Sequence, residues 1–375
     1  MERLASTSHP THKKIGVIGL GIIGRGVAAH LRRKGFAVFV WNRSPRPVPN
    51  FVGSPGELAN LCDFIQIFVS DDEALLQIVE QLNADLAPRH IVFAHSTVAP
   101  DSMRAAAGIV ESQRARFIEA SFTGSKVAAE KGELVYYVGG TDTALREARP
   151  ILEASSKEIV KIGAVGEASA IKIATNMITA ASVQAAAEAL ALVQVLGVPL
   201  EKFIEAMRAN ASYSTTLAMK LPKMLERDFE PHFSVKHMLK DMEIANQIAL
   251  SRYLDLGLTA AARDQLVEQI QWGHGDYDYS AVAGKFLHDG APAVHEEPQM
   301  EAQREKSDAG EPVAATTASD TPGLEPQDRG PMSTQPRKLS GLSFSGAGDG
   351  SAHAAPPLRR RFLRQLLSRF SSGQG

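Results

Sequence analysis

Residues 15–24 read IGVIGLGIIG, and the next ten residues read RGVAAHLRRK. An apolar strand leads here into a G-x-G-x-x-G turn and then into a segment of helical periodicity. At such a junction the first glycine permits a tight turn, the second lets the backbone approach a pyrophosphate, and the third lets the helix pack closely on the strand. The helix N-terminus then offers free N–H groups to an anion. The residues predicted to bind a dinucleotide are Gly19, Leu20, Gly21, Ile22, Ile23 and Gly24.

A glycine-rich turn without a ligand is the alternative interpretation of this stretch. The surrounding pattern favours ligand binding, because the turn lies at the first strand–helix junction of an alternating series. The apolar runs of that series, between Lys13 and about Ile162, are IGVIGL, AVFVW, FIQIFV, HIVFAHS and ELVYYVGG. Helical patterns separate most of these runs, which predicts an α/β fold with a doubly wound, mainly parallel sheet and helices on both faces. A Walker P-loop is excluded because no Gly-Lys-Ser/Thr follows the turn.

The composition changes twice along the chain. From about Glu167 to Phe286 the strand signals are replaced by helical patterns rich in Ala, Leu and Met, which predicts an all-α domain. Beyond Gly290 there is no Trp or Tyr, and the apolar content is too low to offset an ordering cost of roughly 1–2 kcal/mol per residue. The expected organisation is a disordered N-terminus (1–12), a dinucleotide-binding domain (13–165), an all-helical substrate and oligomerisation domain (166–288) and a disordered tail (289–375).

The end of that tail carries a separate signal. Residues 358–370 read LRRRFLRQLLSRF, in which apolar residues recur every fourth position beside five arginines. This pattern is typical of a basic amphipathic helix that lies on an anionic membrane or in a groove of a partner. An unstructured tail with chance periodicity is the simpler interpretation, and we prefer it.

The polar residues after the second apolar run bear on the choice of cofactor. Sites that prefer NAD usually have Asp or Glu there to accept from the ribose 2′-hydroxyl, whereas this chain has Asn42, Arg43 and Ser44. Arg43 can pair with a 2′-phosphate in a fork geometry, and Ser44 can donate to it. One charge-assisted hydrogen bond contributes roughly 1.5–3 kcal/mol. We therefore expect NADP to be preferred over NAD; the alternative is that Arg43 is a surface charge in an ordinary turn.

A long helix is expected from Gly166 to about Leu196, apolar almost all round as in a helix buried between domains or subunits. Its ~28 residues would span ~42 Å at 1.5 Å per residue. Lys172 and Asn176 are one turn apart, so their side chains project together. Desolvation drives a lysine toward its neutral form, which suits a proton donor and acceptor near neutral pH. A snorkelling lysine with a solvent-facing asparagine is the structural alternative.

The composition excludes several classes of protein. The 375 residues carry a formal charge of −2, so we expect no general attraction to nucleic acid. Cys62 is the only cysteine, which excludes a disulfide framework within the chain and fits a cytoplasmic location. No apolar run free of charge reaches the ~18 residues of a membrane span, and the first residues lack the apolar core of a secretory signal. His232 and His237 lack a third ligand, so we expect no metal and interpret both as surface or loop residues.

Several motifs occur together in the order typical of one enzyme family. They are the glycine loop, NRS at 42–44, HSTVAP at 95–100, EASFTGS at 119–125, GEASAIKIATNM at 166–177 and LKDMEIA at 239–245. Over about residues 14–288 the chain resembles the β-hydroxyacid dehydrogenases, which include 3-hydroxyisobutyrate dehydrogenase and semialdehyde reductases, with 6-phosphogluconate dehydrogenase as a more distant relative. The resemblance implies a Rossmann domain, a long interdomain helix and a helical domain that forms homodimers or homotetramers.

The resemblance also implies roles for individual residues. Lys172 matches the family's catalytic lysine, Asn176 its substrate-orienting amide, and Thr97 the threonine near the nicotinamide. Lys240 matches a lysine that closes over cofactor and substrate, and Asp241 is the neighbour of that lysine. The segment that holds the substrate carboxylate corresponds to Thr123, Gly124 and Ser125, and the stretch against the adenosine corresponds to Val69 and Ser70.

Two departures from the family pattern bear on the substrate. The family's Asp-Ala-Pro-Val is replaced by EASF at 119–122, where the loss of proline loosens the loop and Phe122 adds bulk. The segment RPVPNFVGSPGEL at 46–58 replaces a longer helical connection. The expected function is interconversion of a small β-hydroxy acid and its semialdehyde or keto acid by NADP(H), with Lys172 as general acid and base. Alternatives are an imine reductase, which usually carries Asp or Tyr where Lys172 stands, and a non-catalytic cofactor-binding scaffold.

Overall fold

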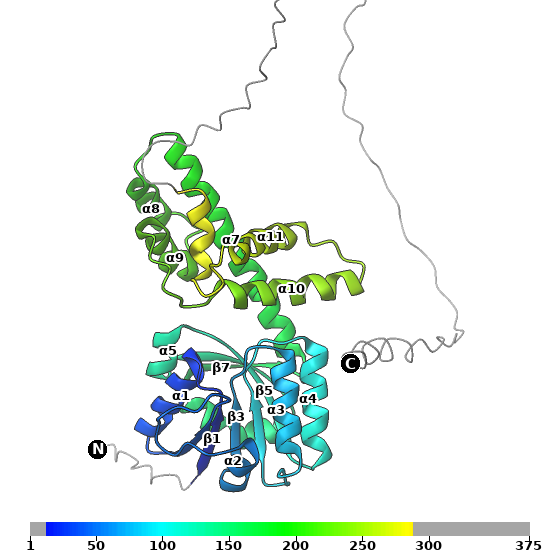
Figure 1. Cartoon of the computed structure of the whole chain (residues 1–375). Coiled ribbons are helices and arrows are strands. Elements are labelled where there is room, and N and C mark those ends of the chain that lie inside the picture. The colour runs from blue at the N-terminus through cyan, green and yellow to red at the C-terminus, as the bar shows by residue number, and fades with distance from the viewer. Residues whose placement is uncertain (1–12, 288–375) are drawn as a thin grey trace, which may run out of the picture. The chain divides into compact units, whose positions relative to one another are not determined.

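The computed structural model describes residues 13–287 (Figure 1). The predictions for residues 1–12 and for the tail from 288 onward, including the amphipathic helix at 358–370, lie outside the described residues. The described chain consists of a seven-stranded sheet with helices, followed by a helical domain.

The sheet has the order β2-β1-β3-β4-β5-β6-β7. Neighbouring strands are parallel except for β5 and β6, which confirms the prediction of a mainly parallel sheet. The strands are β1 (Lys14–Ile18), β2 (Ala37–Trp41), β3 (Phe64–Ile67), β4 (Ile91–Ala94), β5 (Arg116–Thr123), β6 (Leu134–Gly139) and β7 (Ser156–Gly163).

Two of these strands, β5 and β7, are absent from the five runs expected from apolar residues alone. β5 carries the charged residues Arg116 and Glu119, and β7 carries Lys157, Glu158 and Lys161. β7 lies at one edge of the sheet, opposite the edge formed by β2, and is only partly buried, so its residues need not be apolar. β5 is central and mostly buried, but Arg116 and Glu119 interrupt its apolar residues, so a search for continuous apolar runs misses it as well as β7.

Helices cover both faces of the sheet, as expected for a doubly wound fold. One face packs residues such as Val27 of α1 and Leu152 of α6 against the strands, and the other packs Leu58 of α2, Leu75 of α3 and Met103 of α4. These helices are α1 (Ile22–Arg33), α2 (Pro55–Leu61), α3 (Asp72–Asn83), α4 (Pro100–Ser112), α5 (Lys126–Lys131) and α6 (Asp142–Glu153). The sequence predicts that the connection after β2 is shorter than in the family. In the structure that connection contains one helix, α2, of seven residues.

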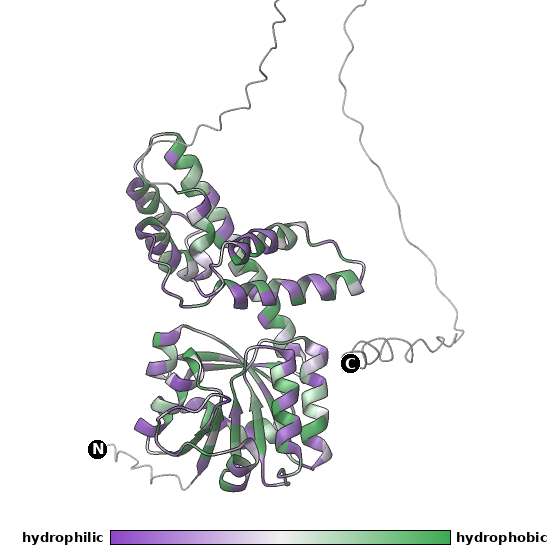
Figure 2. Ribbon diagram, in the orientation of Figure 1, coloured by the Kyte–Doolittle hydropathy of each residue, from purple (hydrophilic) through white to green (hydrophobic). Residues whose placement is uncertain are grey.

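The predicted long helix is confirmed as α7 (Glu167–Val195), which has 29 residues and begins after Gly166 in the left-handed region (φ +94°). It packs on β5, β6 and β7 and also on the helices that follow it. Figure 2 shows apolar residues over most of its length. By length and mean hydropathy alone α7 could cross a membrane, but its residues Val183, Ala187 and Leu190 pack in the core of the helical domain.

The helical domain adds α8 (Leu200–Arg208), α9 (Thr215–Glu226), α10 (Val235–Ser251), α11 (Gly257–Gln271) and the 3₁₀ helix η1 (Tyr279–Lys285). Inside it, Lys220 of α9 donates to both carboxylate oxygens of Asp278 at 2.7 Å, and the two side chains are 2% and 0% exposed. Asp278 also accepts from the backbone N–H groups of His232 and Ser280. This buried ion pair joins α9, the segment before α10 and the start of η1.

Candidate active site

The ends of the parallel strands bring the predicted cofactor-binding segments to one edge of the sheet. β2 lies on one side of β1 and β3 lies on the other, so the order of the strands in the sheet reverses between β1 and β3. Ligands of open α/β sheets bind at such a point, outside the carboxyl ends of the strands. Backbone hydrogen bonds tie the strand ends together: Gly19 N to Trp41 O at 2.9 Å, Phe68 N to Ile18 O at 2.8 Å and His95 N to Ile67 O at 3.0 Å. The loops after β1, β2, β3 and β4 are therefore neighbours.

Each of the three glycines of the first loop is a glycine for a different structural reason. Gly19 has φ +92°, and a Cβ there would lie 1.9 Å from the carbonyl oxygen of Phe68. A Cβ on Gly24 would lie 2.1 Å from the carbonyl oxygen of Gly19. Gly21 differs, because it is exposed and no heavy atom lies within 4 Å of the position of its Cβ. It is also the N-cap of α1 and has no side-chain cap, so the open space and the uncapped N–H groups fit a pyrophosphate.

The residues after β2 divide into a structural one and two exposed ones. The Asn42 side chain accepts from Leu20 N at 2.9 Å and donates to the Ser44 carbonyl at 2.8 Å, so it connects the glycine loop to its own loop. Arg43 and Ser44 are exposed, and within residues 13–287 no hydrogen bond or ion pair engages the Arg43 guanidinium. An exposed guanidinium fits both interpretations of the sequence, a contact with a 2′-phosphate and a surface charge in a turn, so the role of Arg43 stays a prediction.

The loop after β3 is fixed by a serine that sequence reasoning did not assign. The Ser96 hydroxyl accepts from Val69 N at 3.1 Å and donates to Val69 O at 2.8 Å, which joins the loops after β3 and β4. Ser70 donates to the adjacent Asp71, the N-cap of α3. Burial works to raise the pKa of Asp71, but hydrogen bonds and the charges of Lys240 and Arg43 lower it overall.

Four predicted site residues, Lys172, Asn176, Lys240 and Thr97, are joined through Asp241 in one chain of hydrogen bonds. Lys172 Nζ donates to Asn176 Oδ1 at 2.9 Å, and Asn176 Nδ2 donates to Asp241 Oδ2 at 2.6 Å. Lys240 Nζ donates to Asp241 Oδ1 at 2.7 Å and also to the backbone carbonyl of Thr97. The chain therefore runs from α7 through α10 to the loop after β4.

The electrostatics of Lys172 suit proton transfer. Burial lowers the pKa of Lys172 to about 8; the negative charge of Asp241 opposes this shift, and the positive charge of Lys240 adds to it. Near neutral pH an amine with this pKa is mostly protonated and still loses its proton readily. The pairing with Asn176 makes the snorkelling alternative unnecessary, because the ammonium has a partner inside the structure.

The segment expected to hold a carboxylate lies at the end of β5. Thr123 pairs with Val135, and Gly124 has φ +137°. The Ser125 hydroxyl accepts from Ala128 N at 3.4 Å as the N-cap of α5. Within the described part of the chain no hydrogen bond joins this segment to Lys172, so its role stays a prediction.

Glu119, which sequence reasoning quoted without a role, anchors the start of α7. Its carboxylate is completely buried and accepts from Gly166 N at 2.6 Å and from Ser169 N. Gly139 on β6 leaves room for it, since a Cβ there would lie 2.7 Å from Glu119 Oε2. Burial raises the pKa of Glu119, and the hydrogen bonds oppose that shift. The only signal in the sequence is an acidic residue inside an apolar strand.

His95, His237 and Cys62 do not belong to the hydrogen-bonded chain that contains Lys172. His95 is buried, its ring stacks 4.2 Å from that of Phe68, and burial lowers its pKa to about 3, so it is neutral. Cys62 is buried, as expected for a core residue. For His237 the expectation of a surface or loop position is wrong, because the residue lies within α10, half-buried and hydrogen bonded to Ser234. In the region from 13 to 287 no three potential metal ligands come together.

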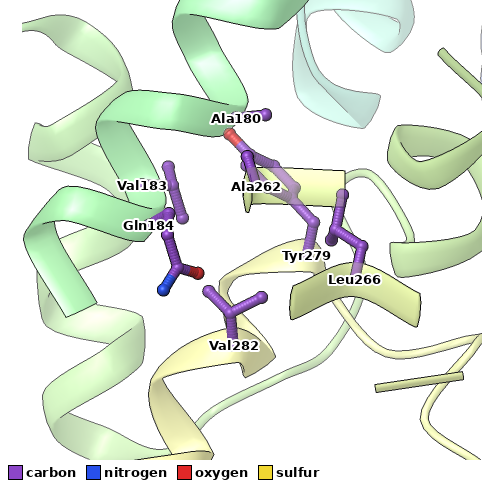
Figure 3. A pocket seen from close by; sticks show the side chains of 7 residues that line it. All are labelled: Ala180, Val183, Gln184, Ala262, Leu266, Tyr279 and Val282. Carbon is purple, nitrogen blue, oxygen red and sulfur yellow. The ribbon is translucent and has the colours of Figure 1, made fainter. Parts of the chain in front are cut away.

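A small cavity lies apart from these residues, inside the helical domain (Figure 3). It is lined by Ala180, Val183, Gln184, Ala262, Leu266, Tyr279 and Val282. The Gln184 amide oxygen has no hydrogen-bond partner among the described residues. The lining contains no charged side chain, and Tyr279 is the one titratable residue in it.

Comparisons with known proteins show which families and folds this chain is similar to. Residues 14–163 match the NAD-binding domain of 6-phosphogluconate dehydrogenase, and residues 166–286 match the NAD-binding domain of NADP-dependent 3-hydroxyisobutyrate dehydrogenase. Glyoxylate/succinic semialdehyde reductase 1 of Arabidopsis thaliana is 27% identical over 279 residues, which cover 72% of this chain and 96% of that protein.

Other relatives broaden the comparison. The cytokine-like nuclear factor N-PAC of Gallus gallus is 28% identical over 74% of this chain, but this chain spans about half (52%) of that relative's length. The structure of 3-hydroxyisobutyrate dehydrogenase from Mycobacterium tuberculosis, solved with L-serine, superposes with a TM-score of 0.67 at 24% identity. That match covers 74% of this chain and 100% of the solved one, and it shows a shared fold.

Proposed function

Because this chain belongs to the β-hydroxyacid dehydrogenase family, we propose that it is an NADP(H)-dependent oxidoreductase of small acids. Its substrate would be a β-hydroxy acid in one direction and the corresponding semialdehyde or keto acid in the other. The observation that carries the proposal is the hydrogen bond between Lys172 and Asn176 on α7. The neighbouring helix α10 contacts the carboxyl edge of the sheet through Lys240, which brings this pair to the predicted cofactor site.

The side chains of the site would divide the work as follows. A bound nicotinamide cofactor would supply or accept the hydride. Lys172 would donate a proton to the carbonyl oxygen during reduction and take the hydroxyl proton during oxidation. Asn176 would hold the ammonium in place at 2.9 Å, and the segment 123–125 would orient the substrate through its carboxylate.

The cofactor preference is part of the proposal. The uncapped N-terminus of α1 at Gly21 would receive the pyrophosphate. Arg43 and Ser44 would contact a 2′-phosphate, since both are exposed and no carboxylate follows β2 to repel it. We therefore propose NADP over NAD.

An assay of NADPH oxidation by the full chain tests the proposed reaction. The substrates to compare are glyoxylate, succinic semialdehyde, tartronate semialdehyde and methylmalonate semialdehyde, with the substitution Lys172→Ala as the matched control. We expect turnover of at least one aldehyde by the wild type and none by the variant, with NADPH binding retained. NADPH binding without turnover of any substrate would refute the enzymatic proposal.

A non-catalytic cofactor-binding scaffold is the second candidate. It is favoured by the similarity to N-PAC proteins, whose name describes nuclear factors rather than enzymes. The same assay separates the two functions, because a scaffold would bind NADPH and reduce nothing. Adding a cyclic imine to the panel tests the imine reductase alternative, against which the presence of Lys172 argues.

The partner surface that we propose lies on α7 and would be covered by a second copy of this chain. One side of α7 carries exposed apolar residues at seven-residue intervals, namely Ile171, Ile178, Ala185 and Leu192, followed by Val195. Ile178 and Leu192 are 69% and 62% exposed, which is unusual for such large apolar side chains in a single stripe. Light scattering should show a dimer or tetramer that dissociates in an Ile178→Asp/Leu192→Asp variant; a monomeric wild type would contradict this.

A further inference from the structure

We infer that Asp241 is the positioning residue of the site: its carboxylate orients the Asn176 amide toward Lys172 and holds Lys240 on the Thr97 carbonyl. The inference rests on the proposed function, because it assigns Asp241 a task in presenting the proton-transferring amine. Asp241 itself does not touch Lys172; it acts through Asn176.

The placement of Asp241 is unusual for an aspartate. Its side chain is on α10 and is 0% exposed, although charged groups are rarely buried without partners. Its two oxygens are used separately, Oδ2 by Asn176 Nδ2 at 2.6 Å and Oδ1 by Lys240 Nζ at 2.7 Å. One buried carboxylate therefore connects α7 to a lysine that contacts the sheet domain.

The chemistry of the partners fixes the direction of each hydrogen bond. A carboxylate accepts hydrogen bonds and has none to donate, so the Asn176 amide must present its nitrogen to Asp241. Its oxygen is then turned toward Lys172, where it accepts from Nζ at 2.9 Å. Lys172 is thereby held as a donor, and the remaining N–H groups of its ammonium are left for a substrate oxygen. Without the carboxylate the amide is free to rotate and to offer N–H groups to Lys172, which favours the neutral amine.

The charge of Asp241 acts in the same direction. Among the described residues, the charged groups that shift the pKa of Lys172 are Asp241 and Lys240, both on α10, with opposite signs. Glu119 of β5 is engaged with the backbone N–H groups of Gly166 and Ser169 at the start of α7. Removing the Asp241 charge therefore lowers the pKa of Lys172 further below its present value of about 8, and removing the Lys240 charge raises it.

The test measures the titration of Lys172 directly, without turnover. Acetylation of the full-length protein with acetic anhydride over a range of pH, followed by peptide mass spectrometry, gives the pH at which Lys172 becomes reactive. For the wild type we expect a midpoint at about 8. Asp241→Asn should move it about one pH unit lower, the size typical of losing a nearby opposite charge. Lys240→Met should move it higher, and this second variant decides the matter if Asp241→Asn does not fold.

A matched control removes a carboxylate that does not face Lys172. Asp276 pairs with Lys236 on the exposed side of α10, so Asp276→Asn should leave the midpoint unchanged. Identical midpoints in wild type, Asp241→Asn and Lys240→Met would overturn the inference, even in an active enzyme. If the labelling midpoint of Lys172 falls in Asp241→Asn and rises in Lys240→Met, the inference is supported. If the protein also turns over no aldehyde, the proposed function is refuted while the inference stands. In an active enzyme the fall of kcat/KM for reduction at high pH should move with the labelling midpoint, which a purely structural role would not produce.

Discussion

Replacing Gly21 with alanine should weaken NADPH binding and leave the fold intact, whereas replacing Gly19 should destabilise the fold itself. The two glycines lie two residues apart in one loop, but their surroundings differ. Gly21 has φ −66° and ψ −168°, which alanine adopts, and no heavy atom lies within 4 Å of its Cβ position. Gly19 has φ +92°, and its Cβ would lie 1.9 Å from the Phe68 carbonyl oxygen.

These distances set the expected magnitudes. For Gly21→Ala the free energy of unfolding should change by no more than about 1 kcal/mol. The new methyl group occupies the space through which a phosphate reaches the α1 N–H groups, and loss of one charge-assisted hydrogen bond weakens NADPH binding about tenfold to a hundredfold. For Gly19→Ala the left-handed backbone costs about 1–2 kcal/mol, and the clash with main chain raises the total to about 3 kcal/mol or more.

Thermal melts and NADPH fluorescence titrations on the same preparations separate the two effects. Gly21→Ala should melt like the wild type but gain little stability from added NADPH, and Gly19→Ala should melt about 6 °C or more below it. A Gly21→Ala protein with wild-type NADPH affinity would show that the pyrophosphate lies elsewhere. A Gly19→Ala protein with wild-type Tm would refute the steric reasoning.

Three further outcomes are expected. Arg43→Asp should weaken NADPH binding by about 10- to 100-fold and NADH binding much less, as titrations with both cofactors will show; equal losses would contradict a 2′-phosphate contact. Lys172→Ala should abolish turnover with NADPH affinity nearly unchanged, and wild-type kcat/KM for aldehyde reduction should fall as the pH rises through about 8, because the protonated amine is the donor. Asp278→Asn should lower the free energy of unfolding in urea by about 3–5 kcal/mol by leaving Lys220 unpaired in the core, whereas a change below about 1 kcal/mol would mean that the pair is not buried in solution.

Local features of this protein can be predicted from its sequence because each depends on residues that are close along the chain. The spacing of Gly19, Gly21 and Gly24 specifies a turn between a strand and a helix, and the structure contains that turn. The length of α7 follows from an unbroken helical pattern, and the one-turn spacing of Lys172 and Asn176 brings their side chains together at 2.9 Å. Helical geometry places residues four apart on the same face, which makes the proximity of these two side chains predictable.

Only the tertiary structure decided what surrounds that pair. Asp241 follows Asn176 by 65 positions, and Lys240 lies 143 positions after Thr97, so no local pattern predicts their contacts. Glu119 could be quoted from the sequence but not interpreted, because its partners are backbone N–H groups at the start of α7. Hydrogen-bond direction and the burial that lowers the pKa of Lys172 are properties of the packed environment, which arises only when α7, α10 and the sheet come together.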